Sequence, residues 1–130
     1  MTRPSIELEY PVLDCPDPIG LARFYSAVLG WEIVRADEDW VVAKSAAGHA
    51  LAFQLAPYFT PLDWPAEGVH THLDFEVTDM DAAQAWVVEL GAEVVDDSAE
   101  HPGFRVFRDP AGHFFCLCFR TESEHPAGSA

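Results

Sequence analysis

An internal repeat restricts the fold of this 130-residue chain more than any other feature. Residues 29–34 read LGWEIV and residues 90–95 read LGAEVV, so leucine, glycine, glutamate and two aliphatic residues recur in the same order. The tripeptide AGH stands before an apolar run at 47–49 and again at 111–113. The two copies are 61 residues apart at the first motif and 64 at the second. We therefore expect two tandem copies of one small module.

Each copy carries a helix whose two ends can be placed. In the first copy, Asp17 is expected to be the N-cap, Pro18 the first helical residue and Gly30 the residue that ends the helix. In the second copy, Asp79 and Gly91 are expected at the corresponding places. The apolar residues between these boundaries recur at helical spacing, which predicts a helix with one buried side.

The elements around the helices predict the fold class. An extended segment precedes each helix, at 6–13 and 72–78, and strand-like runs separated by turn residues follow it. The predicted class is α+β, with two tandem βαβββ modules whose strands form a curved mixed sheet around a shared pocket. A single domain is expected over residues 1–120, made of modules 6–56 and 70–120 with a joining loop at 57–69, and residues 121–130 are expected to be a flexible tail.

The net charge excludes some classes of partner, and the cysteine content indicates the compartment. Seven lysines and arginines stand against 22 aspartates and glutamates, a formal net charge of −15, so nucleic acid and anionic membrane surfaces should be repelled. An odd number of cysteines (Cys15, Cys116 and Cys118) favours buried thiols in a reducing compartment. The sequence shows neither a long apolar stretch nor a signal-peptide pattern, and we expect a cytoplasmic protein.

Strand parity predicts which side chains face a pocket. Alternate residues of a strand point to opposite faces, so His72, Asp74 and Glu76 share one face, and their apolar neighbours pack on the helices. The same argument places Gln54 and Cys116 opposite the helix side of their strands. We expect a pocket wall that contains His72, Gln54 and Cys116.

The joining loop is rich in proline and aromatic residues. Tyr58, Phe59 and Trp64 lie between Pro57 and Pro65, a composition that does not suit a central strand. Two interpretations remain open for this loop. Its aromatic residues form a lid over the pocket, or they plug one end of the core or a subunit interface.

The doubled module resembles a known superfamily. The helix with Phe24-Tyr25 and Leu29-Gly30, and above all the run DPAGHFFCL at 109–117, are similar to the glyoxalase, bleomycin-resistance and extradiol-dioxygenase proteins of the vicinal oxygen chelate superfamily. The resemblance covers roughly residues 6–120. It implies the paired-module fold, and a homodimer whose pockets form with help from the partner chain.

The resemblance also implies four positions for a divalent metal ion. In this sequence they fall on Tyr10, Gln54, His72 and Cys116. His72 and Gln54 are residue types that the superfamily uses, whereas a tyrosine would have to lose its phenolic proton and Cys116 would supply a soft thiolate. We therefore expect no resident cofactor or metal ion.

If a metal ion is bound, the donors favour zinc. The best version of such a site is Zn²⁺ held by His72 and Cys116, with Asp74 or Glu76 as an additional carboxylate.

Three functions are compatible with these residues. The first is a protein that binds a small cationic or aromatic molecule without a catalytic metal, in an acidic pocket where Asp74 and Glu76 meet the cationic group. The second is a metal-dependent lyase, isomerase or dioxygenase in which Glu76 or Asp74 moves a proton. The third is an interaction or regulatory module that binds a partner chain in the same cleft. The aromatic residues expected to line the pocket are Trp40, Tyr58, Phe59, Trp64 and Phe114.

Overall fold

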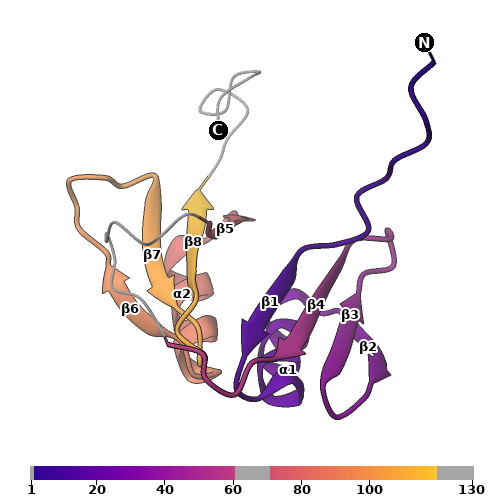
Figure 1. Ribbon diagram of the computed structural model, residues 1–130. Coiled ribbons are helices and arrows are strands. Elements are labelled where there is room, and N and C mark those ends of the chain that lie inside the picture. The colour runs from indigo at the N-terminus through magenta and orange to yellow at the C-terminus, as the bar shows by residue number, and fades with distance from the viewer. Residues whose placement is uncertain (1, 61–70, 120–130) are drawn as a thin grey trace. The chain divides into compact units, whose positions relative to one another are not determined.

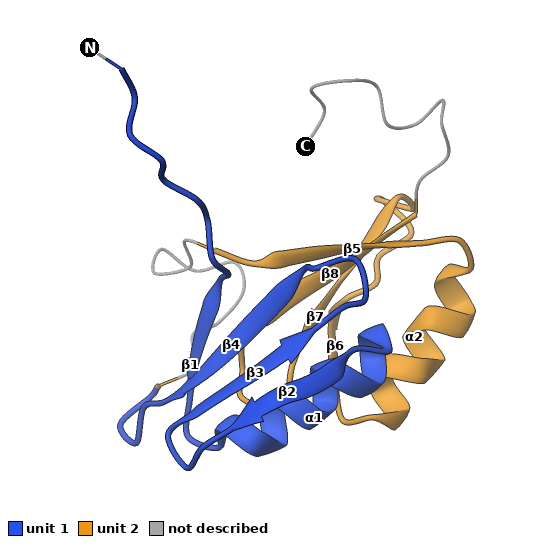
Figure 2. Ribbon diagram, turned by 90° about the vertical axis from the view of Figure 1, so that its right-hand side faces the viewer, with its two compact units in different colours: residues 1–59 blue, residues 60–130 orange. Residues whose placement is uncertain are grey.

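Each half of the repeat folds as a strand, a helix and three further strands in the computed structural model, which describes residues 2–60 and 71–119 (Figure 1). The chain separates into two units, residues 1–59 and 60–130, coloured blue and orange in Figure 2. The division falls within the predicted joining loop. Trp64, one of the predicted pocket residues, lies outside the described residues.

The two units have the same topology. The first contains β1 (Val12–Cys15), α1 (Pro18–Leu29), β2 (Glu32–Ala36), β3 (Trp40–Lys44) and β4 (Ala50–Leu55). The second contains β5 (Leu73–Val77), α2 (Met80–Glu89), β6 (Glu93–Asp96), β7 (Phe104–Arg108) and β8 (Phe114–Phe119). The strand orders are β1-β4-β3-β2 and β5-β8-β7-β6, and in each sheet the first pair is parallel and the others are antiparallel. The α+β class and the tandem βαβββ modules are confirmed, with one four-stranded mixed sheet in each module.

Each helix starts where the sequence predicts, whereas α2 ends one residue early, with Leu90 and not Gly91 as its C-cap. The carboxylate of Asp17 accepts a hydrogen bond from the Gly20 amide at 3.1 Å, and Asp79 accepts one from the Ala82 amide at the same distance. Gly30 ends α1 in the left-handed conformation, at φ 70°, which glycine adopts without strain. None of the helices in the described segments is long and apolar enough to cross a membrane.

The first strand begins later than predicted. The sequence indicated an extended strand from residue 6, but β1 starts at Val12, and the side chains of Ile6 and Leu8 are 71% and 85% exposed. The reason is the partner strand: β4 begins only at Ala50, and the parallel register sets Val12 opposite Ala52. Pro11 also has no amide hydrogen to add to the ladder. In the second module the predicted segment 72–78 agrees with β5 within one residue at each end.

Each module has an aromatic core between its helix and its sheet. In the first, the rings of Tyr25 and Phe53 stack with centroids 5.9 Å apart. In the second, Phe107 stacks on Phe115 at 5.4 Å. The three cysteines are free and buried, which confirms the buried thiols predicted from their odd number.

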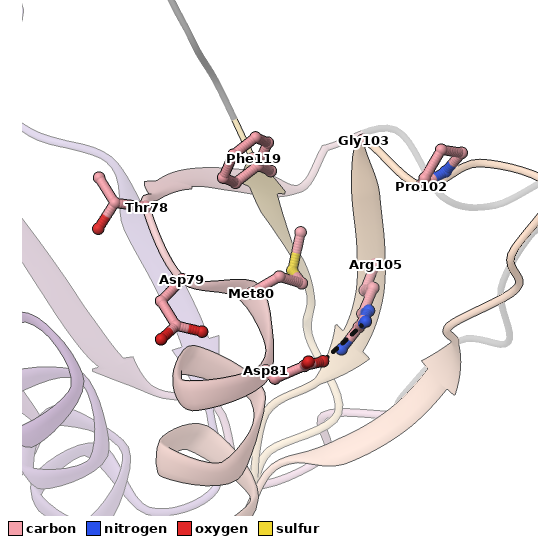
Figure 3. Close-up of a pocket in the computed structure, with 8 residues that line it drawn as sticks. All are labelled: Thr78, Asp79, Met80, Asp81, Pro102, Gly103, Arg105 and Phe119. Carbon is pink, nitrogen blue, oxygen red and sulfur yellow. Dashed lines mark hydrogen bonds and ion pairs between the residues drawn. The ribbon is translucent and has the colours of Figure 1, made fainter.

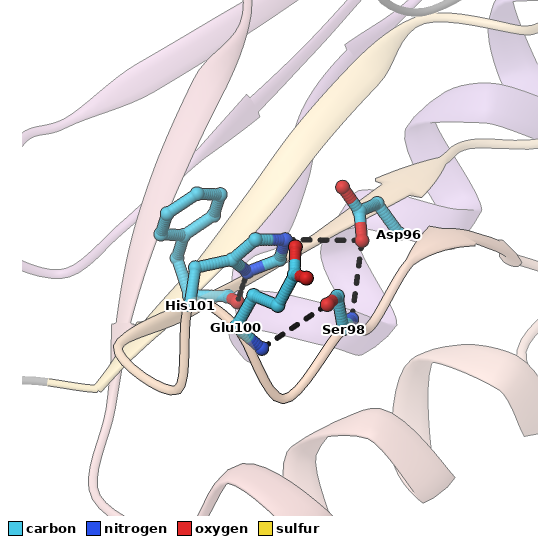
Figure 4. Close-up of polar contacts among 5 residues, drawn as sticks. Asp96, Ser98, Glu100 and His101 are labelled. Carbon is cyan, nitrogen blue, oxygen red and sulfur yellow. Dashed lines mark hydrogen bonds and ion pairs between the residues drawn. The ribbon is translucent and has the colours of Figure 1, made fainter.

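A histidine closes the connection between β6 and β7 (Figure 4). His101 Nε2 lies 3.0 Å from Asp96 Oδ1, and its Nδ1 lies 2.9 Å from the Phe104 carbonyl oxygen. The imidazole also stacks on the Phe104 ring, with centroids 4.1 Å apart. The hydrogen bonds to Phe104 and Asp96 raise the pKa of His101, and the hydrogen bonds from Ser98 and His101 lower the pKa of Asp96.

The His101–Asp96 pair predicts a pH-dependent stability of the second module. Because the pKa of His101 is raised by folding, its contribution is complete below the unfolded value of about 6.5 and is lost as pH rises through the folded value. Asp96 contributes above its unfolded value of about 3.8. We therefore expect His101→Ala to lower the free energy of unfolding most near about pH 5.5 and much less near about pH 9, measured by urea denaturation.

The control for this prediction is His49→Ala, which removes an exposed histidine from the first module. An equal loss of stability at both pH values in the His101 variant would contradict the role of the protonated imidazole.

The helix caps supply a second prediction. Asp17→Ala leaves the Gly20 amide without its acceptor and should destabilise the protein by about 1 kcal/mol in urea denaturation. Asp97→Asn, which removes one exposed carboxylate that caps no helix, is the control. An Asp17→Ala variant as stable as the Asp97→Asn variant would show that this cap is not needed.

Candidate functional site

The turns that join the last two strands have matching hydrogen bonds in the two modules. The Ser45 amide donates to the His49 carbonyl at 2.8 Å, and the Asp109 amide donates to the His113 carbonyl at the same distance. Both turns contain a glycine with positive φ, 95° at Gly48 and 99° at Gly112. The last two strands of the modules therefore correspond with an offset of 64 residues, and the helix caps Asp17 and Asp79 with an offset of 62.

Three side chains that can bind a metal ion converge in the second module. His72 Nε2 lies 3.1 Å from Asp74 Oδ1, and Asp74 stands opposite Cys116 in the parallel pairing of β5 with β8. The donor atoms of the three residues all lie within 4.8 Å of one another. The side chains of His72 and Asp74 are 37% and 40% exposed, whereas Cys116 is only 4% exposed. The group therefore has an exposed polar side and a buried thiol.

The environment of Cys116 keeps its thiol protonated. Burial is the largest cause, and the negative charge of Asp74 and the neighbouring Cys118 add to it. Together with a hydrogen bond to Asp74 they raise the pKa of Cys116 to about 12. At neutral pH the thiol therefore donates a hydrogen bond to the Asp74 carboxylate.

An apolar cluster lies beneath the polar group. Val106, Phe114, Cys116 and Cys118 form one buried cluster, and Val95 packs against it. Phe114 is 5% exposed, and the Arg108 guanidinium lies 5.1 Å from its ring centroid. We call this cluster the apolar floor. Phe114, predicted to line the pocket, belongs to this floor.

Glu76, the other predicted proton-transferring residue, lies further along β5. It stands opposite Cys118, not Cys116, and its side chain is exposed. It is outside the group formed by His72, Asp74 and Cys116.

The first module brings three predicted residues together. Trp40 stands opposite Gln54 in the antiparallel pairing of β3 with β4, and the Tyr10 and Trp40 rings are 6.2 Å apart. The indole Nε1 of Trp40 is buried and has no hydrogen-bond acceptor among residues 2–60 and 71–119. The other two predicted aromatic residues follow β4: Tyr58 is 96% exposed and Phe59 is half-buried.

Asp14 was missed by the sequence prediction. It is exposed on β1 opposite Gln54, as Glu76 is opposite Cys118 on β5. The repeat could have identified it, because the two helix caps are 62 residues apart and Asp14 lies 62 residues before Glu76.

The register changes the alignment of the implied metal positions. Val12 pairs with Ala52 as Asp74 pairs with Cys116, so Ala52 is the first-module equivalent of Cys116. Gln54, which the sequence alignment placed there, is the equivalent of Cys118.

The first module therefore does not fit its half of the superfamily's metal site. Tyr10, Val12 and Ala52 stand where the second module has His72, Asp74 and Cys116, and two of them have no donor atom in the side chain. The four-ligand site that the resemblance implies is thus not supported by these residues.

A cavity of about 560 Å³ beside the start of α2 is a separate feature (Figure 3). Arg105 lies on its wall, but its guanidinium already donates to Asp81 at 3.0 Å and to Gln84 at 2.8 Å. Asp79, which also lines it, caps the helix. The charged groups of this cavity are therefore already engaged, Arg105 by Asp81 and Gln84, and Asp79 by the Ala82 amide.

Comparison with known proteins gives a consistent result. A family model for the glyoxalase-like domain matches residues 11–118. Among solved structures, a glyoxalase/bleomycin resistance/dioxygenase family enzyme from Burkholderia phytofirmans has 16% identity and a TM-score of 0.70, over 88% of this chain and 98% of its own. The fosfomycin resistance protein FosX from Mesorhizobium loti has 20% identity and a TM-score of 0.66, over 91% and 95%.

A third solved structure has a similar fold. The glyoxylase/bleomycin resistance protein/dioxygenase domain from a Frankia species has 20% identity and a TM-score of 0.67, over 94% of this chain and 97% of its own. No curated protein matches the sequence. At these identities the solved structures establish the fold.

The protonated state of Cys116 predicts low reactivity. A pKa of about 12 against an ordinary value of 9.0 lowers the thiolate fraction roughly a thousandfold at neutral pH. In a metal-free Cys118→Ala variant, iodoacetamide should therefore modify Cys116 far more slowly in the folded protein than in urea, as measured by peptide mass spectrometry. Adding Asp74→Asn should raise the rate in the folded state, whereas adding Asp97→Asn should not. Equal rates in the folded and unfolded protein would contradict this description of the thiol.

Proposed function

Because the chain belongs to the glyoxalase-like domain family of the vicinal oxygen chelate superfamily, we propose that it binds a small organic molecule without the catalytic metal ion of that superfamily. Two of the structural relatives carry names that refer to resistance to the antibiotics fosfomycin and bleomycin. Proteins with this fold therefore include some named for small organic compounds. The case for this chain depends on its own residues.

The observation that carries the proposal is the polar pair above the apolar floor in the second module. His72 and Asp74 are about two-fifths exposed, and Cys116 beneath them is buried with Val106 and Phe114. Directed polar groups beside apolar side chains are part of the usual composition of a site for a small molecule.

The charge of the site favours a cationic ligand. Asp74 and Glu76 lie on the same face of β5, and the neutral Cys116 thiol adds no further charge beside them. The net charge of −15 adds a long-range attraction for cations and opposes the approach of anions. We therefore propose an organic cation with an aromatic or other apolar part, whose charged group meets the partly exposed Asp74 carboxylate.

The first module supplies a second set of groups suited to a small molecule. The buried Nε1 of Trp40 is a donor that gains from an acceptor, because an unsatisfied buried polar group costs about 1 to 3 kcal/mol. The exposed amide of Gln54 lies opposite Trp40 on the neighbouring strand. A carbonyl or hydroxyl oxygen of a ligand would satisfy the indole.

A metal-dependent lyase, isomerase or dioxygenase is the second candidate function. The observation that favours it is the convergence of His72, Asp74 and Cys116 within 4.8 Å. In such an enzyme His72 and Cys116 would hold the ion, and Asp74, 3.1 Å from His72, would be the residue that moves a proton. Glu76 is less well placed because Cys118 is its neighbour on β8. The poor donors in the first module make this candidate the weaker one.

Ligand screening by thermal unfolding tests the proposal. Cationic aromatic compounds should raise the melting temperature of metal-free protein, by an amount that grows with concentration, because they bind only the folded state. Asp74→Asn should weaken the shift by removing the central carboxylate, and His72→Ala should weaken it by removing the partner of that carboxylate.

Asp97→Asn is the matched control, since it removes one negative charge from an exposed position of the same unit. A ligand whose effect falls equally in the Asp74 and Asp97 variants would be responding to net charge alone, which contradicts a site at Asp74. The absence of any shift up to about millimolar concentrations of a broad cationic set would contradict the proposed function.

A further inference from the structure

We propose that His72, Asp74 and Cys116 form a binding site for a thiophilic divalent cation, Zn²⁺ above all, built entirely within the second module. It differs from the four-position site that the superfamily resemblance implies, because it takes no residue from the first module and adds Asp74. It goes beyond the proposed function by naming a second occupant of the same face.

The three donors match the chemistry of zinc. Zn²⁺ binds imidazole nitrogen, carboxylate oxygen and thiolate sulfur, usually in tetrahedral geometry. One carboxylate and one thiolate neutralise the two positive charges of the ion, and His72 binds as the neutral imidazole. Three protein ligands leave the fourth position to water. Hard cations such as Mg²⁺ and Ca²⁺ prefer oxygen donors throughout and gain little from a thiolate.

The distances suit a small rearrangement around an ion. At metal–ligand distances of about 2.0 to 2.3 Å, the donors of a tetrahedral zinc site lie roughly 3.3 to 3.8 Å apart. The donor atoms here lie within 4.8 Å of one another, and the His72–Asp74 pair is already at 3.1 Å. Rotation of exposed side chains can close a difference of about 1 Å. The backbone is fixed where it matters, because Asp74 and Cys116 are direct partners in the β5–β8 ladder.

The site is also accessible to an ion, and the proton that Cys116 loses on binding has a place to go. The partly exposed His72 and Asp74 side chains let an ion enter from solvent, while the sulfur of Cys116 closes the buried side. On binding, the sulfur–hydrogen bond of Cys116 is replaced by a sulfur–zinc bond, and the proton passes to the buffer. The hydrogen bond from the thiol to Asp74 is lost, and the carboxylate binds the ion instead.

The repeat provides an internal comparison. Tyr10, Val12 and Ala52, the first-module equivalents, cannot form such a group. One step along the same pair of strands, Glu76 and Cys118 have the same cross-strand relation as Asp74 and Cys116. Among the described residues, however, only the group at Asp74 and Cys116 gains a third donor, from His72.

Bound zinc would affect the proposed organic ligand. The ion occupies His72 and Asp74 and neutralises the carboxylate that attracts a cation, so the two occupants should exclude each other. Metal binding is nevertheless measured without any organic compound, and its failure is therefore distinct from failure of the proposed function.

The test is a titration of the full, tag-free chain after its metals have been removed by a chelator. Co²⁺, which reports its ligands in the absorption spectrum, should bind one ion per chain and give a thiolate-to-cobalt charge-transfer band in the near ultraviolet. Zn²⁺ should displace it, and Mg²⁺ should not. Cys116→Ser should abolish the band, and His72→Gln should weaken binding at least about tenfold.

Cys118→Ser is the matched control, because it removes a thiol two residues along the same strand that does not bind the ion, so the band should persist. His72→Gln alters an exposed position and keeps the core, so it tests the site even if Cys116→Ser does not fold. No band in the native chain would overturn the proposal. So would a band that survives Cys116→Ser, one lost in Cys118→Ser, or affinity unchanged by His72→Gln.

Discussion

The parallel pairing of the first and last strands of each module is the constraint on which the candidate site depends. In the second module this pairing sets Asp74 beside Cys116 and Glu76 beside Cys118. Residues 42 positions apart in the sequence are thereby fixed as neighbours by backbone hydrogen bonds. The same pairing in the first module sets Val12 beside Ala52, so identical backbone geometry gives a polar group in one copy and an apolar contact in the other.

A site of this kind combines two opposed requirements. The apolar floor needs Cys116 buried for packing, and burial beside Asp74 holds the thiol in its neutral form. The exposed His72 and Asp74 contribute little to packing and are kept in contact with solvent. The buried Cys116 therefore contributes mainly to the stability of the fold, and the exposed His72 and Asp74 are the residues available to bind a ligand.

Much of the fold could be predicted from the sequence because its signals are local. Aspartate caps, a glycine in the left-handed conformation and alternating strands each act over a few residues, and the repeat doubles the evidence for them. The start of β1 could not be predicted in this way. Residues 6–11 have the composition of a strand, but whether they pair depends on where β4 begins, which is a tertiary property.

The candidate site was predictable only in part, for a similar reason. Strand parity predicted that His72, Asp74 and Glu76 share one face of their strand. It also predicted that Cys116 lies on the side of its own strand that faces away from the helix. Register decided which carboxylate meets the thiol, and strand parity carries no information on register. The same gap led Gln54 to be aligned with Cys116 in place of Ala52.

The closing of each sheet by its first strand also has a kinetic consequence. Contacts between β5 and β8 enclose the helix and two strands, so the chain entropy of closing a long loop must be overcome before Asp74 meets Cys116. Local hairpins such as β7–β8 form without that cost. The group of His72, Asp74 and Cys116 is thus assembled at a late stage of folding. Any molecule that binds this group stabilises the β5–β8 pairing and slows the opening of the completed sheet.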